Sequence, residues 1–152
     1  MKQKTIIQVW GTANTGKSTT IKITREELIR KFINNAHTYN LPLAPGDIND
    51  VLICNNIKIG IESMGDYLWY GNLHERLNNL VINQQCDIII CASRVRNDVA
   101  RHIDYLANQN DYRRLKVTPI GGKEPSFEQS DLNIMSAKQI VDTIDGIMSG
   151  II

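Results

Sequence analysis

The feature that most constrains the fold is residues 5–18, where a strand pattern gives way to a glycine-containing loop and then to a helix pattern. Thr5–Trp10 is mostly β-branched, aliphatic or aromatic, which predicts a buried strand. Gly11 ends the strand pattern, and from Gly16 onward the apolar residues recur at helical spacing. A strand that turns into a helix through a short loop is typical of a sheet with helical crossovers. The stretch therefore predicts an α/β fold.

The loop itself has the residues of an anion-binding site. Gly11 and Gly16 permit backbone conformations and close approaches that a Cβ atom would forbid. The N–H groups between them can form a nest for phosphate, and the following helix adds the positive end of its dipole. Lys17 is expected to reach the β- and γ-phosphates, and the Ser18 hydroxyl is a hard oxygen ligand suited to Mg²⁺. The predicted nucleotide-binding residues are Gly11, Thr12, Ala13, Asn14, Thr15, Gly16, Lys17, Ser18 and Thr19.

The segment Gly11–Ser18 matches the pattern G-x-x-x-x-G-K-[ST] at every fixed position. On these residues the chain resembles the P-loop NTPase superfamily. The resemblance implies that the chain binds a nucleoside triphosphate with Mg²⁺ as its cofactor. It does not imply one reaction, because that fold includes hydrolases, kinases, transferases and switches.

The rest of the chain alternates strand and helix patterns, which predicts a mostly parallel sheet covered on both faces. Residues 36–49 lack periodicity and are expected to be a loop, either functional or a surface excursion. The resulting fold class is a three-layer αβα sandwich with about five strands, one of them an antiparallel edge strand contributed by a hairpin. The other predicted strands cover residues 51–54, 57–61, 87–91 and 115–120, and the helices about 16–34, 73–81, 97–107 and 135–148, with Ser136 as a possible cap of the last helix.

A P-loop requires an acidic group at the end of a neighbouring strand, either to hold the Mg²⁺ water shell or to orient the attacking group. Glu62 ends the predicted hairpin, and Gly65 and Asp66 follow. This order resembles translation-factor-type GTPases, in which an aspartate holds the place of Glu62. Glu62 is therefore the first candidate for the metal-linked or water-orienting acid, and Asp66 is the second. The alternative is that Glu62 is a solvent-exposed strand end and Asp66 a helix cap.

Arg94 follows the buried run Asp87–Cys91, at the end of a strand where ligands bind in open α/β sheets. It could reach a γ-phosphate, or pair on the surface with Asp98 or Asp66. The basic stretch 94–123 reads as a solvated face more readily than as a lid. The aromatic residues at 67–70 could stack on a base or acceptor, although packing within the protein is favoured.

Chain length and composition bear on the number of domains, the partners and the location of the protein. A chain of 152 residues has the size of one domain, so residues 1–152 are expected to form a single nucleotide-binding domain. The formal net charge of +1 does not indicate nucleic acid as a partner. Three cysteines without zinc-site spacing indicate reduced core thiols, and no apolar run is long enough to span a membrane. A cytoplasmic location is therefore expected.

The predicted function is the binding of a nucleoside triphosphate and the Mg²⁺-dependent hydrolysis of its γ-phosphate. ATP is favoured because the guanine-reading motif Asn-Lys-x-Asp is absent from the sequence. The first alternative is a kinase acting on a small molecule, a nucleoside or a nucleotide. The second is a nucleotide-sensing binding module with negligible turnover. The candidate catalytic residues are Lys17, Glu62, Asp66 and Arg94, and any acceptor or protein partner is unidentified.

Overall fold

The structure is a computed structural model of the chain. It describes residues 3–12, 15–32, 46–121 and 127–152 in full and the backbone of residues 36–40. Ala13 and Asn14, in the middle of the predicted phosphate loop, lie outside the described residues. The predictions made for these two residues remain predictions.

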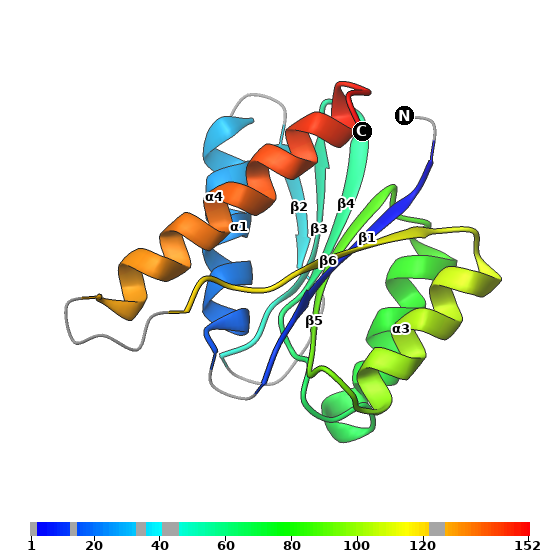
Figure 1. Cartoon of the computed structure of the whole chain (residues 1–152). Helices are drawn as coiled ribbons and strands as arrows, with labels where there is room; N and C mark the ends of the chain where they lie inside the picture. The colour runs from blue at the N-terminus through cyan, green and yellow to red at the C-terminus, as the bar shows by residue number, and fades with distance from the viewer. Residues whose placement is uncertain (1–2, 13–14, 33–35, 41–45, 122–126) are drawn as a thin grey trace.

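A six-stranded sheet in the order β2-β3-β4-β5-β1-β6 forms the centre of the described structure (Figure 1). The strands β4, β5, β1 and β6 run parallel to one another. The strand β3 is antiparallel to both β2 and β4. The strands are β1 Thr5–Trp10, β2 Ala36–Asn40, β3 Asn49–Cys54, β4 Ile57–Glu62, β5 Ile88–Ser93 and β6 Arg113–Val117.

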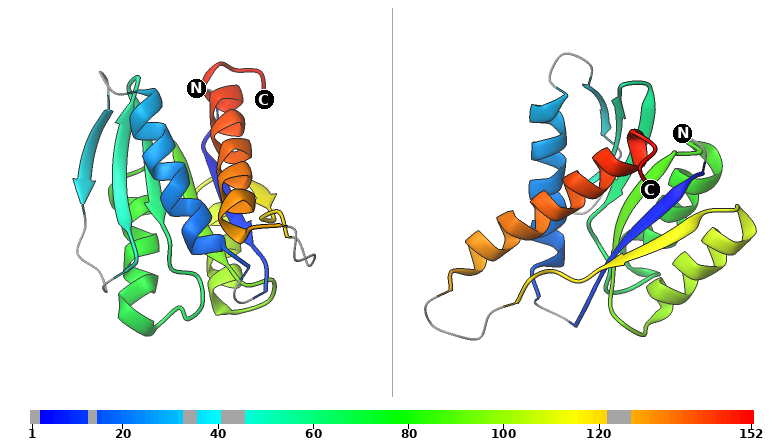
Figure 2. Two further views of the ribbon diagram at one scale, coloured as in Figure 1. Left: turned by 90° about the vertical axis from the view of Figure 1, so that its left-hand side faces the viewer. Right: turned by 45° about the horizontal axis from the view of Figure 1, so that its top comes forward.

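Helices cover both faces of the sheet, as Figures 1 and 2 show from three directions. The helices α1 and α4 pack side by side on one face, and α2 and α3 lie on the other. The expected fold class, a three-layer αβα sandwich with a mostly parallel sheet, is confirmed. The helices are α1 Lys17–Lys31, α2 Leu73–Asn78, α3 Asp98–Gln109 and α4 Gln129–Met148; a 3₁₀ turn, Tyr70–Asn72, precedes α2 and a π-helical turn, Asn79–Asn83, continues it.

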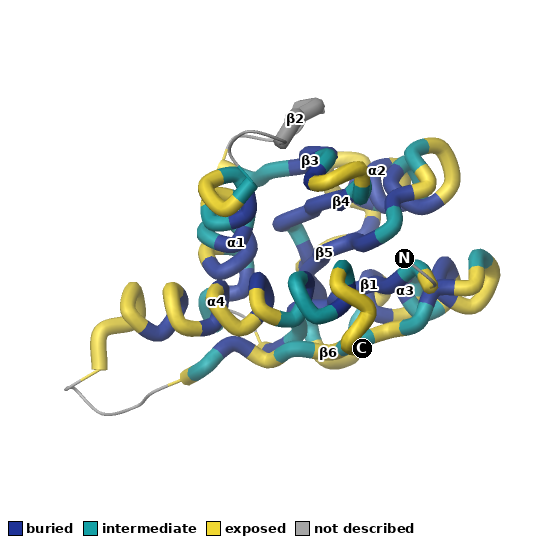
Figure 3. The backbone as a smooth tube through the Cα atoms, turned by 90° about the horizontal axis from the view of Figure 1, so that it is seen from above, coloured by how far each residue is buried: buried dark blue, intermediate teal, exposed yellow. Residues whose placement is uncertain are grey.

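The buried apolar residues divide into two cores, one on each face of the sheet. Figure 3 shows the strands of the sheet between α1 and α4 on one side and α2 and α3 on the other, with buried backbone in dark blue. Ile89 and Cys91 of β5 belong to the core under α2 and α3, whereas Ile88 and Ile90 belong to the core under α1 and α4. Successive side chains of a strand point to opposite faces, so a strand covered on both faces must be apolar at nearly every position. The unbroken apolar run of β5 is the sequence signature of this arrangement.

Three predicted boundaries differ from the structure. Part of the expected 36–49 loop forms β2, so the edge strand on that side is β2, and β3 lies inside the sheet. The final helix begins at Gln129, so Ser136 is internal and does not cap it. Its hydroxyl donates to Leu132 O at 2.9 Å and accepts from Ile120 N–H. The strand predicted at 115–120 begins at Arg113 and ends at Val117.

The three cysteines, Cys54, Cys86 and Cys91, are buried and free of disulfide bonds, as predicted. Burial raises the pKa of the Cys54 thiol to about 11, which keeps it protonated and unreactive at neutral pH. No helix among the described residues is both long and apolar enough to cross a membrane.

Candidate functional site

Three parallel strands, β1, β4 and β5, end at one edge of the sheet. The predicted site residues lie at these strand ends or in the loops that follow them. Gly11 follows β1, Ser63 follows β4 and Arg94 follows β5. The buried strand predicted at 87–91 is β5, and it pairs in parallel with β1, the strand that precedes the predicted phosphate loop. The crevice outside the carboxyl ends of such strands is where open α/β sheets bind ligands.

A pocket of about 440 Å³ lies at this edge. Its walls come from the start of α1, from the loop after β4 and from the segment before β3. The lining residues are Thr15, Gly16, Lys17, Ser18, Thr19, Asp47, Ser63, Met64, Gly65, Asp66, Tyr67, Tyr70 and Ala92. The structure therefore brings together the described end of the phosphate loop and one of the two predicted acids, Asp66. Glu62 does not line this pocket.

Lys17 is held by the loop that precedes it. Its Nζ donates to the carbonyl oxygens of Gly11 at 2.9 Å and Thr12 at 2.7 Å. The residue is 7% exposed, and burial lowers the pKa of its ammonium group, an effect opposed by the nearby Asp66 carboxylate and reinforced by Arg94. An ammonium group with few water contacts and one open side interacts strongly with an anion placed in the pocket.

Gly16 is the position in the loop where glycine is required. Its φ of 80° is left-handed, and it immediately precedes α1. A Cβ atom there would lie 2.3 Å from Oδ1 of Asn133, on the α4 helix. Gln129 Nε2 donates to the same oxygen at 2.8 Å, which fixes it in place. The beginning of α4 therefore packs directly against the phosphate loop, a contact that the loop sequence does not indicate.

Glu62 lies at the end of β4, as predicted, but it is fully buried and its carboxylate is occupied. It accepts hydrogen bonds from Arg76 Nε at 2.6 Å, Asn49 Nδ2 at 2.7 Å and the Met64 N–H at 3.0 Å. Burial raises the pKa of Glu62, and these three donors oppose that rise. Its assignment to the metal stays a prediction, but the geometry favours a role in tying β4 to α2.

Asp66 lies at the mouth of the pocket, where its Oδ1 accepts from Arg94 Nε at 3.1 Å. Both side chains are partly exposed, and the Arg94 guanidinium lies 5.5 Å from the centre of the Tyr67 ring. Of the two pairings considered for Arg94 from the sequence, the structure shows the one with Asp66. Arg101 pairs with Asp98 instead, on the exposed side of α3. This pairing fits the solvated-face interpretation of the basic stretch.

Gly65 explains how the loop after β4 approaches the sheet. A Cβ atom at this position would come within 2.5 Å of the carbonyl group of Ala92 in β5. Only glycine allows the loop to lie this close to the end of β5, and Asp66 follows directly. The sequence interpretation did not predict this close contact with β5. Gly65 and Asp66 both line the pocket.

Asp47 is a pocket residue that the sequence interpretation missed. Ser63 Oγ donates to Asp47 Oδ1 at 3.1 Å and accepts from the Ile48 N–H at 2.8 Å, which joins the segment before β3 to the loop after β4. The available signal was an acidic residue shortly before a predicted strand, within the segment 36–49 that was expected to be either a functional loop or a surface excursion.

The aromatic residues are exposed, contrary to the packing that was favoured from the sequence. Tyr67 is 62%, Trp69 70% and Tyr70 66% exposed. Tyr67 and Tyr70 line the open end of the pocket, while the Trp69 ring stacks on His74, with ring centres 4.5 Å apart.

The donor set of the pocket fits Mg²⁺. Ser18, Asp47 and Asp66 supply a hydroxyl and two carboxylates, which are the hard oxygen ligands that this cation prefers. Within the described residues there is no cluster of three or more His, Cys, Asp or Glu that could hold a metal by itself. Mg²⁺ characteristically binds through one or two protein ligands, several waters and the phosphates of its substrate, so the small set is sufficient.

No family model matches the chain, and no curated protein matches it. Two solved structures are distantly similar. The crystal structure of APE1195 is 11% identical, with a TM-score of 0.39, and the match covers 99% of this chain and 77% of the other. Thymidylate kinase from Ehrlichia chaffeensis is 12% identical, with a TM-score of 0.37 and coverages of 91% and 99%. At these TM-scores neither similarity carries an argument about function.

Proposed function

We propose that the chain binds Mg²⁺·ATP in the pocket at the start of α1 and hydrolyses its γ-phosphate. The observation that carries the proposal is one shared pocket for Lys17, Ser18 and Asp66, built from two loops far apart in the sequence. The start of α1 adds the positive end of a helix dipole, which favours phosphate. The choice of ATP rests on the sequence, because the guanine-reading motif is absent.

Each residue has a role that follows from its chemistry. Lys17, fixed by the two loop carbonyls, would pair with the β- and γ-phosphate oxygens. Ser18 and Asp66 would hold Mg²⁺, with Asp47 within the same pocket as a further carboxylate. When bound, the cation would neutralise charge on the phosphate oxygens. The N–H groups at the start of α1 would orient the phosphate chain.

Arg94 would change partners when the nucleotide binds. Its present partner, Asp66, is also the carboxylate proposed for the cation, and the pair is exposed enough to be weak. Once Asp66 turns to the metal, the guanidinium is free to approach the γ-phosphate, where it would stabilise the charge of the transition state. Such an arginine contributes to rate more than to nucleotide affinity.

A kinase is the second candidate, and one observation favours it. The pocket lining includes the exposed rings of Tyr67 and Tyr70 besides Lys17 and Ser18. Exposed tyrosine rings can stack against a planar or sugar-bearing molecule, so these two could contact an acceptor.

The test is ADP release from ATP·Mg²⁺, measured alone and with a panel of nucleosides, nucleotides and sugars, for the wild type and Arg94→Ala. A hydrolase releases ADP without an acceptor, and Arg94→Ala lowers that rate by at least tenfold. A kinase shows acceptor-stimulated release that Arg94→Ala abolishes. If ATP·Mg²⁺ binds but no condition releases ADP, the binding-module interpretation replaces both. An absence of ATP binding would refute the proposal altogether.

A further inference from the structure

Asn97 occupies the turn between β5 and α3 and uses both ends of its side-chain amide. Its Oδ1 accepts from the Ala100 N–H at 3.0 Å, which caps α3. Its Nδ2 donates to two backbone carbonyls of the loop after β4, those of Gly65 and Asp66, each at 3.1 Å. One side chain therefore joins the start of α3 to the loop that carries Asp66.

The capping role does not by itself require asparagine. Serine, aspartate and asparagine cap helices about equally well, because the helix needs only an oxygen acceptor. The two bonds to Gly65 and Asp66 need an N–H donor, which serine and aspartate cannot supply in that direction. The three partners also fix the orientation of the amide, since the reversed orientation would place its oxygen against two carbonyl oxygens.

The loop held by Asn97 also lies close to the sheet. A Cβ atom at Gly65 would collide with Ala92 of β5, so the backbone there contacts both β5 and the amide of Asn97. Arg94 contacts the same loop through the Asp66 carboxylate, but that contact is exposed and competes with any cation. Asn97 leaves the carboxylate untouched and holds only the backbone beneath it.

We infer that Asn97 is a positioning residue that orients Asp66 toward the cation-binding side of the nucleotide pocket. The effect of Asn97 on Mg²⁺ binding rests on the proposed function. Its two hydrogen bonds to the Gly65 and Asp66 carbonyls, called the clamp below, do not. Groups that hold a metal ligand in place contribute about 10- to 100-fold to metal affinity or activity in other proteins. Loss of the clamp should therefore weaken the Mg²⁺-dependent part of ATP binding by a similar factor.

The first measurement concerns the protein without ligand. Backbone ¹⁵N order parameters of Gly65 and Asp66 should be near the rigid value of about 0.85 in the wild type and fall below about 0.6 in Asn97→Ser. Asn110→Ser, at the other end of α3, is the matched control and should leave both values unchanged. Unchanged order parameters in Asn97→Ser would overturn the clamp, whatever the protein binds.

The second measurement is calorimetric titration of ATP with Mg²⁺ and with EDTA. Asn97→Asp and Asn97→Ser keep a helix cap but lose the two bonds to the loop, so both should stay folded with some loss of unfolding free energy. Asn97→Ser should weaken ATP·Mg²⁺ binding at least tenfold and leave metal-free ATP binding unchanged. Asn97→Asp also adds a charge that repels the anionic nucleotide, so the uncharged Asn97→Ser is the deciding variant. Equal losses with EDTA and Mg²⁺ would contradict the inference.

A double-mutant cycle identifies the residue through which Asn97 acts. In an Asp66→Ala background, Asn97→Ser should cause no further loss of Mg²⁺-dependent affinity, because both changes remove one interaction. Additive losses would show that Asn97 does not act through Asp66. If the wild type fails to bind ATP, the proposed function is refuted, while the order parameters still decide whether the clamp exists.

Discussion

Arg76 Nε donates to Glu62 Oε1 at 2.6 Å, and the two side chains are only 8% and 0% exposed. The same guanidinium also donates to the carbonyl of Gly71. The two acids of the candidate site therefore have different surroundings. Glu62 is bonded to α2 through Arg76, whereas Asp66 lines the pocket.

Removing one member of the pair should cost stability rather than nucleotide binding. Arg76→Met leaves an uncompensated buried carboxylate and should lower the free energy of unfolding by about 3–5 kcal/mol. Asp66→Asn, at an exposed position, should leave the unfolding curve nearly unchanged and weaken Mg²⁺-dependent ATP binding. Urea titrations and calorimetry compare the two variants. If Glu62→Gln lowers turnover at least tenfold without loss of stability, Glu62 is the catalytic acid and the choice of Asp66 is wrong.

Gly16→Ala should destabilise the protein by two separable effects. A non-glycine residue in the left-handed region costs about 1–3 kcal/mol, and the new Cβ would also meet Asn133. Gly150 is a matched control, with φ of 79° and nothing within 4 Å of a built Cβ. Urea unfolding should show a larger loss for Gly16→Ala than for Gly150→Ala, and Asn133→Ala should recover part of the difference. Equal losses at both glycines would contradict the contact with α4.

Ser18→Ala should weaken ATP binding mainly when Mg²⁺ is present. The hydroxyl is proposed as a metal ligand, whereas the proposed phosphate contacts of the loop would come from backbone groups and Lys17. Calorimetry with Mg²⁺ and with EDTA measures the two affinities separately. A loss of the same size in both conditions would mean that Ser18 acts on the loop structure and not on the metal.

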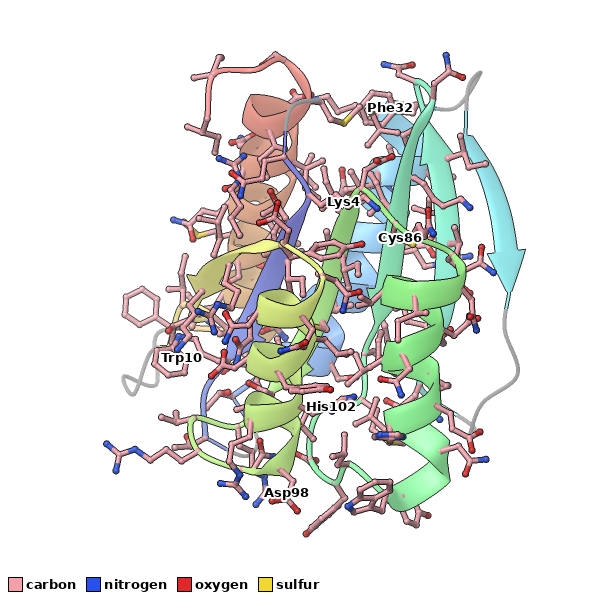
Figure 4. The ribbon with its side chains drawn as sticks, turned by 90° about the vertical axis from the view of Figure 1, so that its right-hand side faces the viewer. Lys4, Trp10, Phe32, Cys86, Asp98 and His102 are labelled. Carbon is pink, nitrogen blue, oxygen red and sulfur yellow. The ribbon has the colours of Figure 1, made fainter. Side chains whose placement is uncertain are left out.

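His102 should make stability depend on pH in the mildly acidic range. Figure 4 labels His102 on α3; its Nε2 lies 2.8 Å from Asn78 Oδ1 of α2, and its ring centre is 4.6 Å from that of His74. Burial lowers the pKa of His102 below 6.5, and the neighbouring His74 adds to that shift. Below pH 6.5 the unfolded chain therefore binds the proton more readily, so stability should rise as the pH increases toward neutrality.

The comparison that tests this dependence is urea unfolding of the wild type and His102→Gln at several values from pH 5 to pH 7.5. The wild type should gain more stability over this range than the variant. Glutamine can still donate to Asn78 but does not titrate. The difference in pH dependence between the two proteins therefore reports the protonation of His102. Parallel curves for the two proteins would show that His102 does not carry the effect.

The sequence predicted the elements whose own residues show a clear hydrophobic pattern. The strand β5 is apolar at nearly every position because both its faces are covered, and it was found for that reason. The strand β2 escaped detection because an edge strand needs only its neighbour β3 for hydrogen bonds, and Ala36–Asn40 has little apolar character. The beginning of α4 was missed for a similar reason, because its first residues are polar and mostly exposed.

The candidate site was predictable where a local pattern dictates the geometry, as at Gly16 and Lys17. The different surroundings of Glu62 and Asp66 were not, because they depend on Arg76, which lies on α2. The contacts of Asn97 with Gly65 and Asp66 involve a loop about thirty residues earlier in the chain, and a cap residue gives no sign of what its amide nitrogen contacts.

Nucleotide binding itself is tested most directly by calorimetric titration of ATP·Mg²⁺ into the wild type and Lys17→Ala. Circular dichroism and urea unfolding establish that the variant is folded. We expect saturable binding to the wild type and no detectable binding to folded Lys17→Ala, because the ammonium group fixed by the carbonyls of Gly11 and Thr12 would be the main partner of the phosphates. An unchanged affinity in the folded variant would show that the proposed site does not bind ATP·Mg²⁺.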